Sequence, residues 1–280
     1  MPPLKTIVLK VGRVVKIANK NKCFERLGEE RLNNQGCLMK IVEYVEALNI
    51  TVEFQDKYNA RIKSRYDDFI KGNIKNPYHP SVCGVGMIGV KYPATINGVI
   101  TKEYNAWKHM LDRCYNDKIK NKYPSYENTI CCDEWLLYEN FYNWLHSQEN
   151  FDKWLNGKRW ALDKDILIKG NKVYSPETCC LVPQNVNVLF TKREAARGDL
   201  PIGVSLSSDK TYYVVQFSNP LKNKTSKYAD KCYTINGAFL SYKKLKEQTI
   251  KTVAQIEFLQ GNITRRCYNA MMNYEVEITD

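Results

Sequence analysis

The stretch "WALDKDILIKGNKVYSPETCCLVPQNVNVLF" covers residues 160–190 and decides the fold of the middle of the chain. Its opening residues predict a strand that ends in an acid, Asp163, and a Lys-Gly-Asn turn follows at residues 169–171. Pro183 then predicts the first turn of a short helix that carries Asn187. The expected order is therefore strand, turn and helix, and the stretch contains no histidine.

A longer pattern of aromatic, cysteine and polar residues surrounds this stretch. Its members are Trp107, Arg113, Cys114, Tyr126, Cys132, Asp133, Glu134, Trp135, Phe141, Trp144, Leu162, Asp163, Asn171, Tyr174, Ser175, Pro176, Glu177, Cys179 and Asn187. With these residues the middle of the chain resembles the phage-encoded proteins grouped with the HNH endonucleases, which are ββα-metal nucleases. The resemblance implies a central finger of two strands and a helix that binds one divalent metal ion.

The resemblance also implies which residues do the chemistry. Asp163 and Asn187 would hold Mg²⁺ or Mn²⁺, which neutralises charge on the scissile phosphate. Lys164 stands where nucleases of this class carry the histidine that activates water, and a lysine is ordinarily protonated at neutral pH. Lys164 is therefore expected to contact phosphate, Asp165 is a weak candidate base, and Asn171 would orient the base or the loop.

The other histidines and the cysteines leave alternatives open. His79, His109 and His146 lie outside the stretch, and His146 is the one most readily imagined as a replacement base. Cys114, Cys132 (or Cys131) and Cys179 match cysteine positions that recur in the resembled proteins, so they and a fourth ligand could hold a structural Zn²⁺. Against zinc, the chain has no Cys-x-x-Cys pair, and cysteine is a common core residue.

The C-terminal segment predicts a three-stranded sheet and a helix. Residues 202–218 form two strands around a Ser-Asp-Lys turn, and 227–235 supply the third strand. Residues 236–258 predict an amphipathic helix that Asn236 caps. In the second strand one face carries Tyr213, Val215 and Phe217, which we expect to pack on the helix, and the other face stays free.

This order resembles the Apetala/ethylene-response-factor DNA-binding domain, although Lys231 and Cys232 replace a Leu-Gly pair frequent in that family. The resemblance implies that the free face of the sheet enters the major groove of double-stranded DNA. The residues that would face the groove are Ser205, Ser207, Lys210, Tyr212, Val214 and Gln216. Lys222, Lys224 and Lys227 would contact phosphates, which set position and not sequence.

The N-terminal segment predicts a small β-rich module. Residues 38–45 alternate, with Met39, Ile41 and Glu43 on one face, and residues 50–56 alternate in the same way. Residues 64–72 predict a short helix. The arrangement resembles a small uncharacterised module common in phage-type proteins. It is either an accessory DNA-binding unit or a packing unit; the basic residues concerned are Lys63, Arg65, Lys71 and Lys75.

The composition of the chain limits the kinds of partner and cellular compartment that fit these predictions. The 280 residues carry a net charge of +12, divided as +7 over residues 1–100, +1 over 101–199 and +4 over 200–280, which suits a polyanionic partner. No apolar run reaches the ~18 residues of a membrane span, and the N-terminus lacks the apolar core of a signal peptide. We therefore expect a cytosolic protein with reduced cysteines.

The sequence thus predicts an α+β, multi-domain protein of three parts. These are a β-rich module at 1–76, the HNH-like domain at 77–198 and the DNA-binding domain at 199–280. Two classes of function remain. One is a sequence-recognising homing endonuclease that depends on Mg²⁺ or Mn²⁺. The other is a non-catalytic DNA-binding regulator, or an interference or inhibitor protein, whose nuclease finger has degenerated; the oligomeric state stays open.

Overall fold

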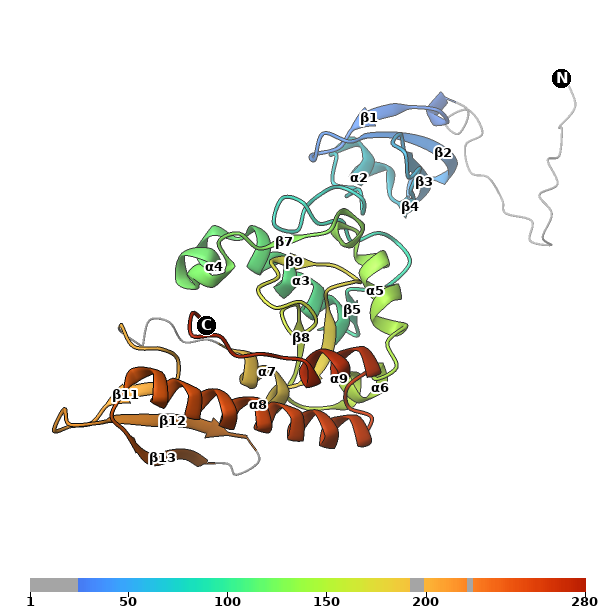
Figure 1. Cartoon of the computed structure of the whole chain (residues 1–280). Coiled ribbons are helices and arrows are strands. Elements are labelled where there is room, and N and C mark those ends of the chain that lie inside the picture. Colours follow the sequence, from blue (N-terminus) through green and yellow to red (C-terminus); the bar gives the residue numbers. More distant parts are fainter. Residues whose placement is uncertain (1–24, 192–198, 221–223) are drawn as a thin grey trace, which may run out of the picture. The chain divides into compact units, whose positions relative to one another are not determined.

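The computed structural model describes residues 25–191, 199–220 and 224–280 (Figure 1). These residues form helices and several small sheets, so the fold is of the mixed α+β class. The chain divides into two compact units. One runs to Pro80 and includes Met87–Val90, and the other comprises Ser81–Gly86 and Lys91–Asp280. The division lies close to the predicted boundary at residue 76, whereas the segments on either side of residue 198 belong to one unit.

The first unit is a four-stranded antiparallel sheet with one short helix. Its elements are β1 (Glu30–Leu32), β2 (Leu38–Glu46), β3 (Asn49–Phe54), β4 (Arg61–Ser64) and α2 (Tyr66–Ile70), and the strands pair in sequence order. The alternation in the sequence correctly predicts the core, because Met39, Ile41, Ile50, Val52 and Phe54 are fully buried. Phe69 of α2 closes this core from the helix side.

One residue of this sheet lies on a different face from the one predicted. The pairing of β2 with β3 is irregular between Ile41 and Glu43, so that Glu43 pairs with Thr51 while Ile41 pairs with Val52. The extra residue of a bulge moves the following side chain to the other face. Glu43 consequently leaves the face of Ile41, and its carboxylate accepts a hydrogen bond of 2.9 Å from the Thr51 hydroxyl.

The first half of the second unit is mainly helical. Its elements are β5 (Thr95–Ile96), β6 (Val99–Ile100), α3 (Lys102–Tyr115), α4 (Asp117–Lys122), β7 (Ile130–Cys131), α5 (Tyr138–His146) and α6 (Phe151–Asn156). Thr101 caps α3, and the helix buries Trp107, which donates a hydrogen bond of 2.6 Å to the Trp135 carbonyl. Trp135 and Phe141 are also buried, so this half of the unit has an aromatic core.

The stretch at residues 160–190 folds as two antiparallel strands followed by a helix, and we call it the finger. It contains β8 (Trp160–Asp163), β10 (Cys180–Pro183) and α7 (Gln184–Phe190), while β9 (Val173–Tyr174) pairs in parallel with β7. Asp163 pairs with Cys180 at the end of the ladder. Pro183 occupies the N-cap position of α7 without a side-chain capping hydrogen bond, so it lies one residue before the first turn in which the sequence predicted it.

The C-terminal sheet has the predicted order β11-β12-β13, with strands β11 (Val204–Leu206), β12 (Tyr213–Asn219) and β13 (Lys224–Cys232). Helix α8 (Ile235–Leu259) lies along one face of this sheet (Figure 1). Val215 and Phe217 are buried against Phe239 and Tyr242 of the helix, so the predicted inner face is confirmed. The predicted cap is wrong, because Thr234 and not Asn236 accepts the hydrogen bond from Gly237 N.

The second half of α8 packs on the finger together with α9 (Arg265–Met272), a helix that the sequence did not predict. One buried cluster joins residues of the finger, α8 and α9. Its members are Ile166, Cys180, Val182, Val186, Leu189, Ile250, Val253, Ala254, Ile263, Cys267 and Met271. The finger and the C-terminal segment therefore share a single hydrophobic core, and α8 serves two packing roles along its length.

Candidate functional site

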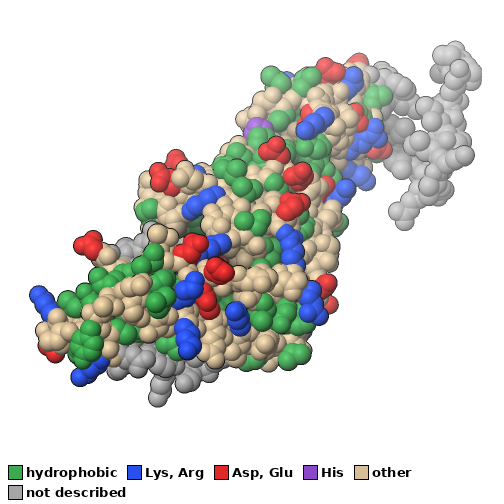
Figure 2. All heavy atoms as spheres, in the orientation of Figure 1, with side chains coloured by type: hydrophobic (Ala, Val, Ile, Leu, Met, Phe, Trp, Pro, Cys, Tyr) green, Lys and Arg blue, Asp and Glu red, His purple; other side chains and the backbone are tan. Residues whose placement is uncertain are grey.

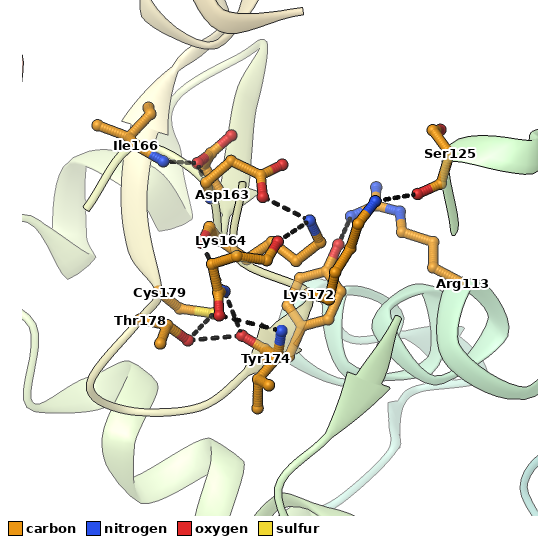
Figure 3. A network of polar contacts seen from close by, with 12 residues as sticks. Arg113, Ser125, Asp163, Lys164, Ile166, Lys172, Tyr174, Thr178 and Cys179 are labelled. Atoms are coloured by element: carbon orange, nitrogen blue, oxygen red, sulfur yellow. Dashed lines mark hydrogen bonds and ion pairs between the residues drawn. The ribbon is translucent and has the colours of Figure 1, made fainter. Parts of the chain in front are cut away.

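Asp163, the expected metal ligand, closes the turn at the end of β8. Its Oδ1 accepts hydrogen bonds from Asp165 N at 2.7 Å and Ile166 N at 2.8 Å (Figure 3). Burial raises the pKa of the Asp163 carboxyl above its usual value, and the two backbone donors oppose this shift. One carboxylate oxygen is therefore already used to hold the loop that starts here.

Lys164, which occupies the position of the missing histidine, lies inside this loop. It is 5% exposed, and its ammonium donates to Asp165 Oδ1 at 2.6 Å and to the Asn171 carbonyl at 2.8 Å (Figure 3). The same ammonium lies 5.9 Å from the centroid of the Tyr174 ring. The contact with a DNA phosphate that the sequence predicts would require Lys164 to give up these internal partners.

Asn171 and Thr178 complete the loop. The Asn171 amide donates to the Lys164 carbonyl at 2.8 Å and to the Val173 carbonyl at 2.7 Å. Thr178 Oγ1 donates to the same Val173 carbonyl at 2.6 Å. Of the two roles expected for Asn171, the structure gives it contacts that suit orientation of the loop.

The loop is also tied to the helical half of the unit. Arg113 of α3 donates to the Tyr174 hydroxyl at 3.2 Å, and Lys172 donates to the Ser125 carbonyl at 3.0 Å (Figure 3). Burial raises the pKa of the Tyr174 phenol, so this hydroxyl stays neutral. These contacts are long-range, and only the place of Arg113 and Tyr174 in the resembled pattern singles them out in the sequence.

Asn187, the second expected ligand, lies on α7 and is partly buried. The structure brings it and Asp163 into one β–β–α unit, on the helix and on the first strand respectively. Within the described ranges, no three His, Cys, Asp or Glu side chains lie close enough together to hold a metal ion. Of the two expected ligands, only Asp163 belongs to these four residue types. The lack of such a cluster therefore says nothing about a site made from Asp163 and Asn187.

A residue that sequence reasoning missed holds α7 in place. Glu257 of α8 is buried, and its carboxylate accepts 2.6 Å and 2.7 Å hydrogen bonds from the side-chain amides of Asn185 and Asn262. No local pattern could have found this contact, because Glu257 and Asn185 are 72 residues apart. The bond fixes the helix that carries Asn187 to the C-terminal half of the unit.

The histidine proposed as a replacement base has other neighbours. His146 Nε2 lies 3.5 Å from Glu103 Oε1, and its ring packs between Tyr142 and Phe151, each 3.9 Å away by ring centroids. His79 belongs to the first unit, where its ring contacts the Cys37 thiol. His109 is exposed on α3. These contacts describe structural surroundings for His146 and His79.

The three cysteines proposed for zinc do not form a ligand cluster in the described part of the chain. Cys114 and Cys179 are buried, and burial raises the pKa of each thiol to about 12. A hydrogen bond from the Cys131 side chain instead lowers the pKa of Cys132. A bound zinc ion would itself hold these thiols as thiolates, so the zinc site stays a prediction.

The face of the C-terminal sheet away from α8 carries the residues expected to face DNA. Gln216 is exposed, and its Nε2 donates to Ser205 Oγ at 3.0 Å across the β11–β12 pair. Tyr212 and Val214 are partly buried, and Lys210 is exposed in the turn before β12. In Figure 2 this end of the molecule is mainly hydrophobic or uncharged, with Lys and Arg side chains at its margins.

Ser207 differs from the other members of this set. It is 9% exposed, and its hydroxyl donates to Asp209 Oδ1 at 2.6 Å and accepts from Tyr212 N at 3.2 Å. Ser207 therefore holds the turn and does not project from the sheet. Lys222 lies outside the described residues; Lys224 and Lys227 lie on β13, where the described structure does not extend to their side chains.

Some of the basic residues of the first unit form ion pairs with acidic side chains. Lys63, Arg65 and Lys75 are exposed, whereas Lys71 pairs with Asp67 at 2.8 Å. On the same sheet Arg61 pairs with Glu53 at 2.6 Å. The first unit thus offers scattered cations, which fits either reading of its role.

Comparison of the chain with protein-family models, with curated proteins and with solved structures finds no match. Among the described residues, no helix is long and apolar enough to cross a membrane.

Proposed function

We propose that the chain is a sequence-recognising DNA-binding protein of the phage or mobile-element type. The observation that carries the proposal is the free face of the C-terminal sheet. One face packs on α8. On the other face Gln216 is exposed, and Ser205 and Val214 are partly buried. A β-sheet with one face free of its own helix, uncharged along β11 and β12 and with Lys210 exposed in the adjoining turn, is a surface that the DNA major groove can accept.

The Gln216 amide is prepared for a base contact. One of its two N–H groups bonds to Ser205, which fixes the plane of the amide. The second N–H and Oε1 can still bond to N7 and N6 of an adenine, since an amide offers two donors and one acceptor oxygen. Because the amide is held before DNA arrives, less side-chain entropy is lost on binding.

The charge of the chain supports a polyanionic partner. Its net charge is +12, and both sequence flanks are basic. Each phosphate contact releases counterions, so the logarithm of the affinity should fall by about 0.9 for each contact per tenfold rise in salt. Fluorescence anisotropy with labelled duplex DNA at 50–200 mM salt tests the proposal; an affinity that does not change with salt would contradict it.

A metal-dependent endonuclease is the second candidate. It is favoured by the β8–β10–α7 order, which has Asp163 on the first strand and Asn187 on the helix. These two residues would hold Mg²⁺ or Mn²⁺, whose charge would assist cleavage of a phosphodiester. The hydrogen bonds of Asp163, Lys164 and Asn171 within their own loop favour the non-catalytic alternative, a regulator or an interference or inhibitor protein.

Nicking of supercoiled plasmid separates the two candidates. The full chain is incubated with plasmid and Mg²⁺ or Mn²⁺, beside an Asp163→Ala variant and a Lys118→Ala control on α4. Nicks that disappear with Asp163→Ala and persist with Lys118→Ala support the endonuclease. Binding of DNA without nicks supports the non-catalytic protein.

A further inference from the structure

Helices α8 and α9 form a helix–turn–helix pair at the C-terminal end of the second unit. The turn comprises residues 260–264, and Gly261 takes a left-handed conformation with φ of +63°, which a glycine adopts at no steric cost. Ile263 is buried and anchors the turn. Thr264 caps α9, because its hydroxyl accepts a hydrogen bond from Cys267 N at 3.3 Å.

The turn is held rigidly by Asn262. Its carbonyl accepts from the Asn150 amide at 2.8 Å, and its side-chain oxygen accepts from Lys153 Nζ at 3.3 Å. Its own amide donates to the buried Glu257 at 2.7 Å. With one side of α9 buried through Cys267 and Met271, the helix presents its other side in a fixed orientation.

The outer side of α9 carries Arg265, Arg266 and Asn269, which are all exposed. The guanidinium carbon of Arg265 lies 4.1 Å from the centroid of the Phe258 ring and 5.6 Å from that of Tyr268. Stacking on these rings orients the planar guanidinium group of Arg265. The N–H groups at its edge can still donate hydrogen bonds to two acceptor atoms of a ligand. Arg266 donates to the Pro176 carbonyl at 3.3 Å, so this side of α9 adjoins the loop before β10.

The charge of this surface selects the kind of partner. Two arginines occupy the first turn of α9, where the positive end of the helix dipole favours acids, and no acid occurs there. This arrangement costs some helix stability in isolation, and an anionic partner at the start of α9 offsets that cost.

We propose that α9 is a second DNA-reading element, whose first turn enters the major groove. Arg265 and Asn269 would contact base edges, since arginine pairs with guanine and asparagine with adenine, and Arg266 would contact a phosphate. The proposal rests on the proposed DNA-binding function and extends it. The recognised site then includes base pairs beside the finger as well as those under the C-terminal sheet.

The test begins with selection of duplex DNA by the full chain from a randomised pool. Affinities for the selected duplex and for a shuffled duplex are then measured by anisotropy for Arg265→Ala, Asn269→Ala and the control Lys118→Ala. Arg265→Ala and Asn269→Ala should each weaken binding to the selected duplex by about 5- to 150-fold, and Asn269→Ala should change binding to the shuffled duplex little. Arg266→Ala should weaken both and reduce the salt slope by about 1.

The outcomes separate this inference from the function on which it rests. If the full chain binds duplex DNA and both α9 variants behave like Lys118→Ala, α9 does not read DNA, and the proposed function stands. If the full chain binds no duplex, both proposals fail. The melting temperature of each variant shows whether it folds. Arg265→Ala could unfold the protein because it removes the packing of Arg265 on Phe258. In that case Asn269→Ala decides the question, since Asn269 is exposed and its replacement leaves the core unchanged.

Discussion

Lys246 is a half-buried cation whose replacement should stabilise the protein. It lies on α8 and lines a small pocket with Leu189, Ile202 and Tyr242, and its ammonium is 5.5 Å from the centroid of the Phe217 ring. Asp280 lines the same pocket, but its carboxylate pairs with Lys169 at 2.9 Å. Burial lowers the pKa of Lys246 from 10.5 to about 8.

The shift sets the size and the pH window of the effect. A change from 10.5 to about 8 corresponds to about 3 kcal/mol at about 1.4 kcal/mol per unit, which is the cost of keeping the charge in the folded state. Since the folded pKa is the lower one, the unfolded chain binds more protons between about pH 8 and 10.5. The free energy of unfolding therefore rises with pH across that window, and the full penalty applies below it.

Lys246→Met removes the charge and keeps an unbranched side chain of similar length. We expect it to raise the free energy of unfolding at pH 6.5 by up to about 3 kcal/mol, with a smaller gain as the pH passes from 8 towards 10. Urea denaturation followed by circular dichroism at pH 6.5, 8 and 9.5 measures this. The control is Lys244→Met, because Lys244 is exposed on the same helix. A gain independent of pH, or a loss at pH 6.5, would refute the reasoning.

Three further predictions concern the sheet and the finger. Gln216→Ala should weaken binding to the selected duplex by ~1–3 kcal/mol and to a shuffled duplex little, whereas Lys224→Ala, at an expected phosphate contact, should weaken both similarly; anisotropy on both duplexes checks this. Lys164→His should raise the rate of plasmid nicking by about 10²- to 10⁴-fold if the finger is catalytic, and a folded, DNA-binding variant without nicks would exclude that. Gly203→Ala should lower the free energy of unfolding by about 1–3 kcal/mol, because Gly203 has φ of +75° and a Cβ would lie 2.0 Å from the Tyr242 ring; an unchanged urea midpoint would contradict this.

The sequence predicts the elements whose pattern is local. Alternation identifies the cores of both larger sheets, since Ile50 and Val215 lie where a period of two puts them. It fails at Glu43, because a bulge adds a residue that no periodicity encodes. Helical periodicity also misses α9, because a helix of 8 residues spans too few turns to show a repeating pattern; it becomes stable by packing Cys267 and Met271 on the finger.

The candidate site was harder to predict than the fold around it. The sequence places Asp163 and Lys164 at the end of a strand and Asn171 in the turn that follows; in the structure hydrogen bonds join the three in one loop. Their spacing does not reveal that they bond to one another and to the backbone of that loop. Whether a polar group points inward depends on partners elsewhere in the chain, such as Tyr174, whose ring lies beside the Lys164 ammonium.

The core shared by the finger, α8 and α9 limits how this protein can be divided or recombined. A fragment that stops at residue 198 would leave Ile166, Val182 and Val186 without the apolar surface that covers them, and such a fragment should aggregate. Exchange of the C-terminal sheet for that of another protein would succeed only if the donor also supplied a helix that fits the finger. The smallest portion of this unit that could be transplanted therefore runs from Lys91 to Asp280, because Val276 beyond α9 belongs to the core of the C-terminal sheet. A new surface would arise here by substitution on the sheet more easily than by domain shuffling.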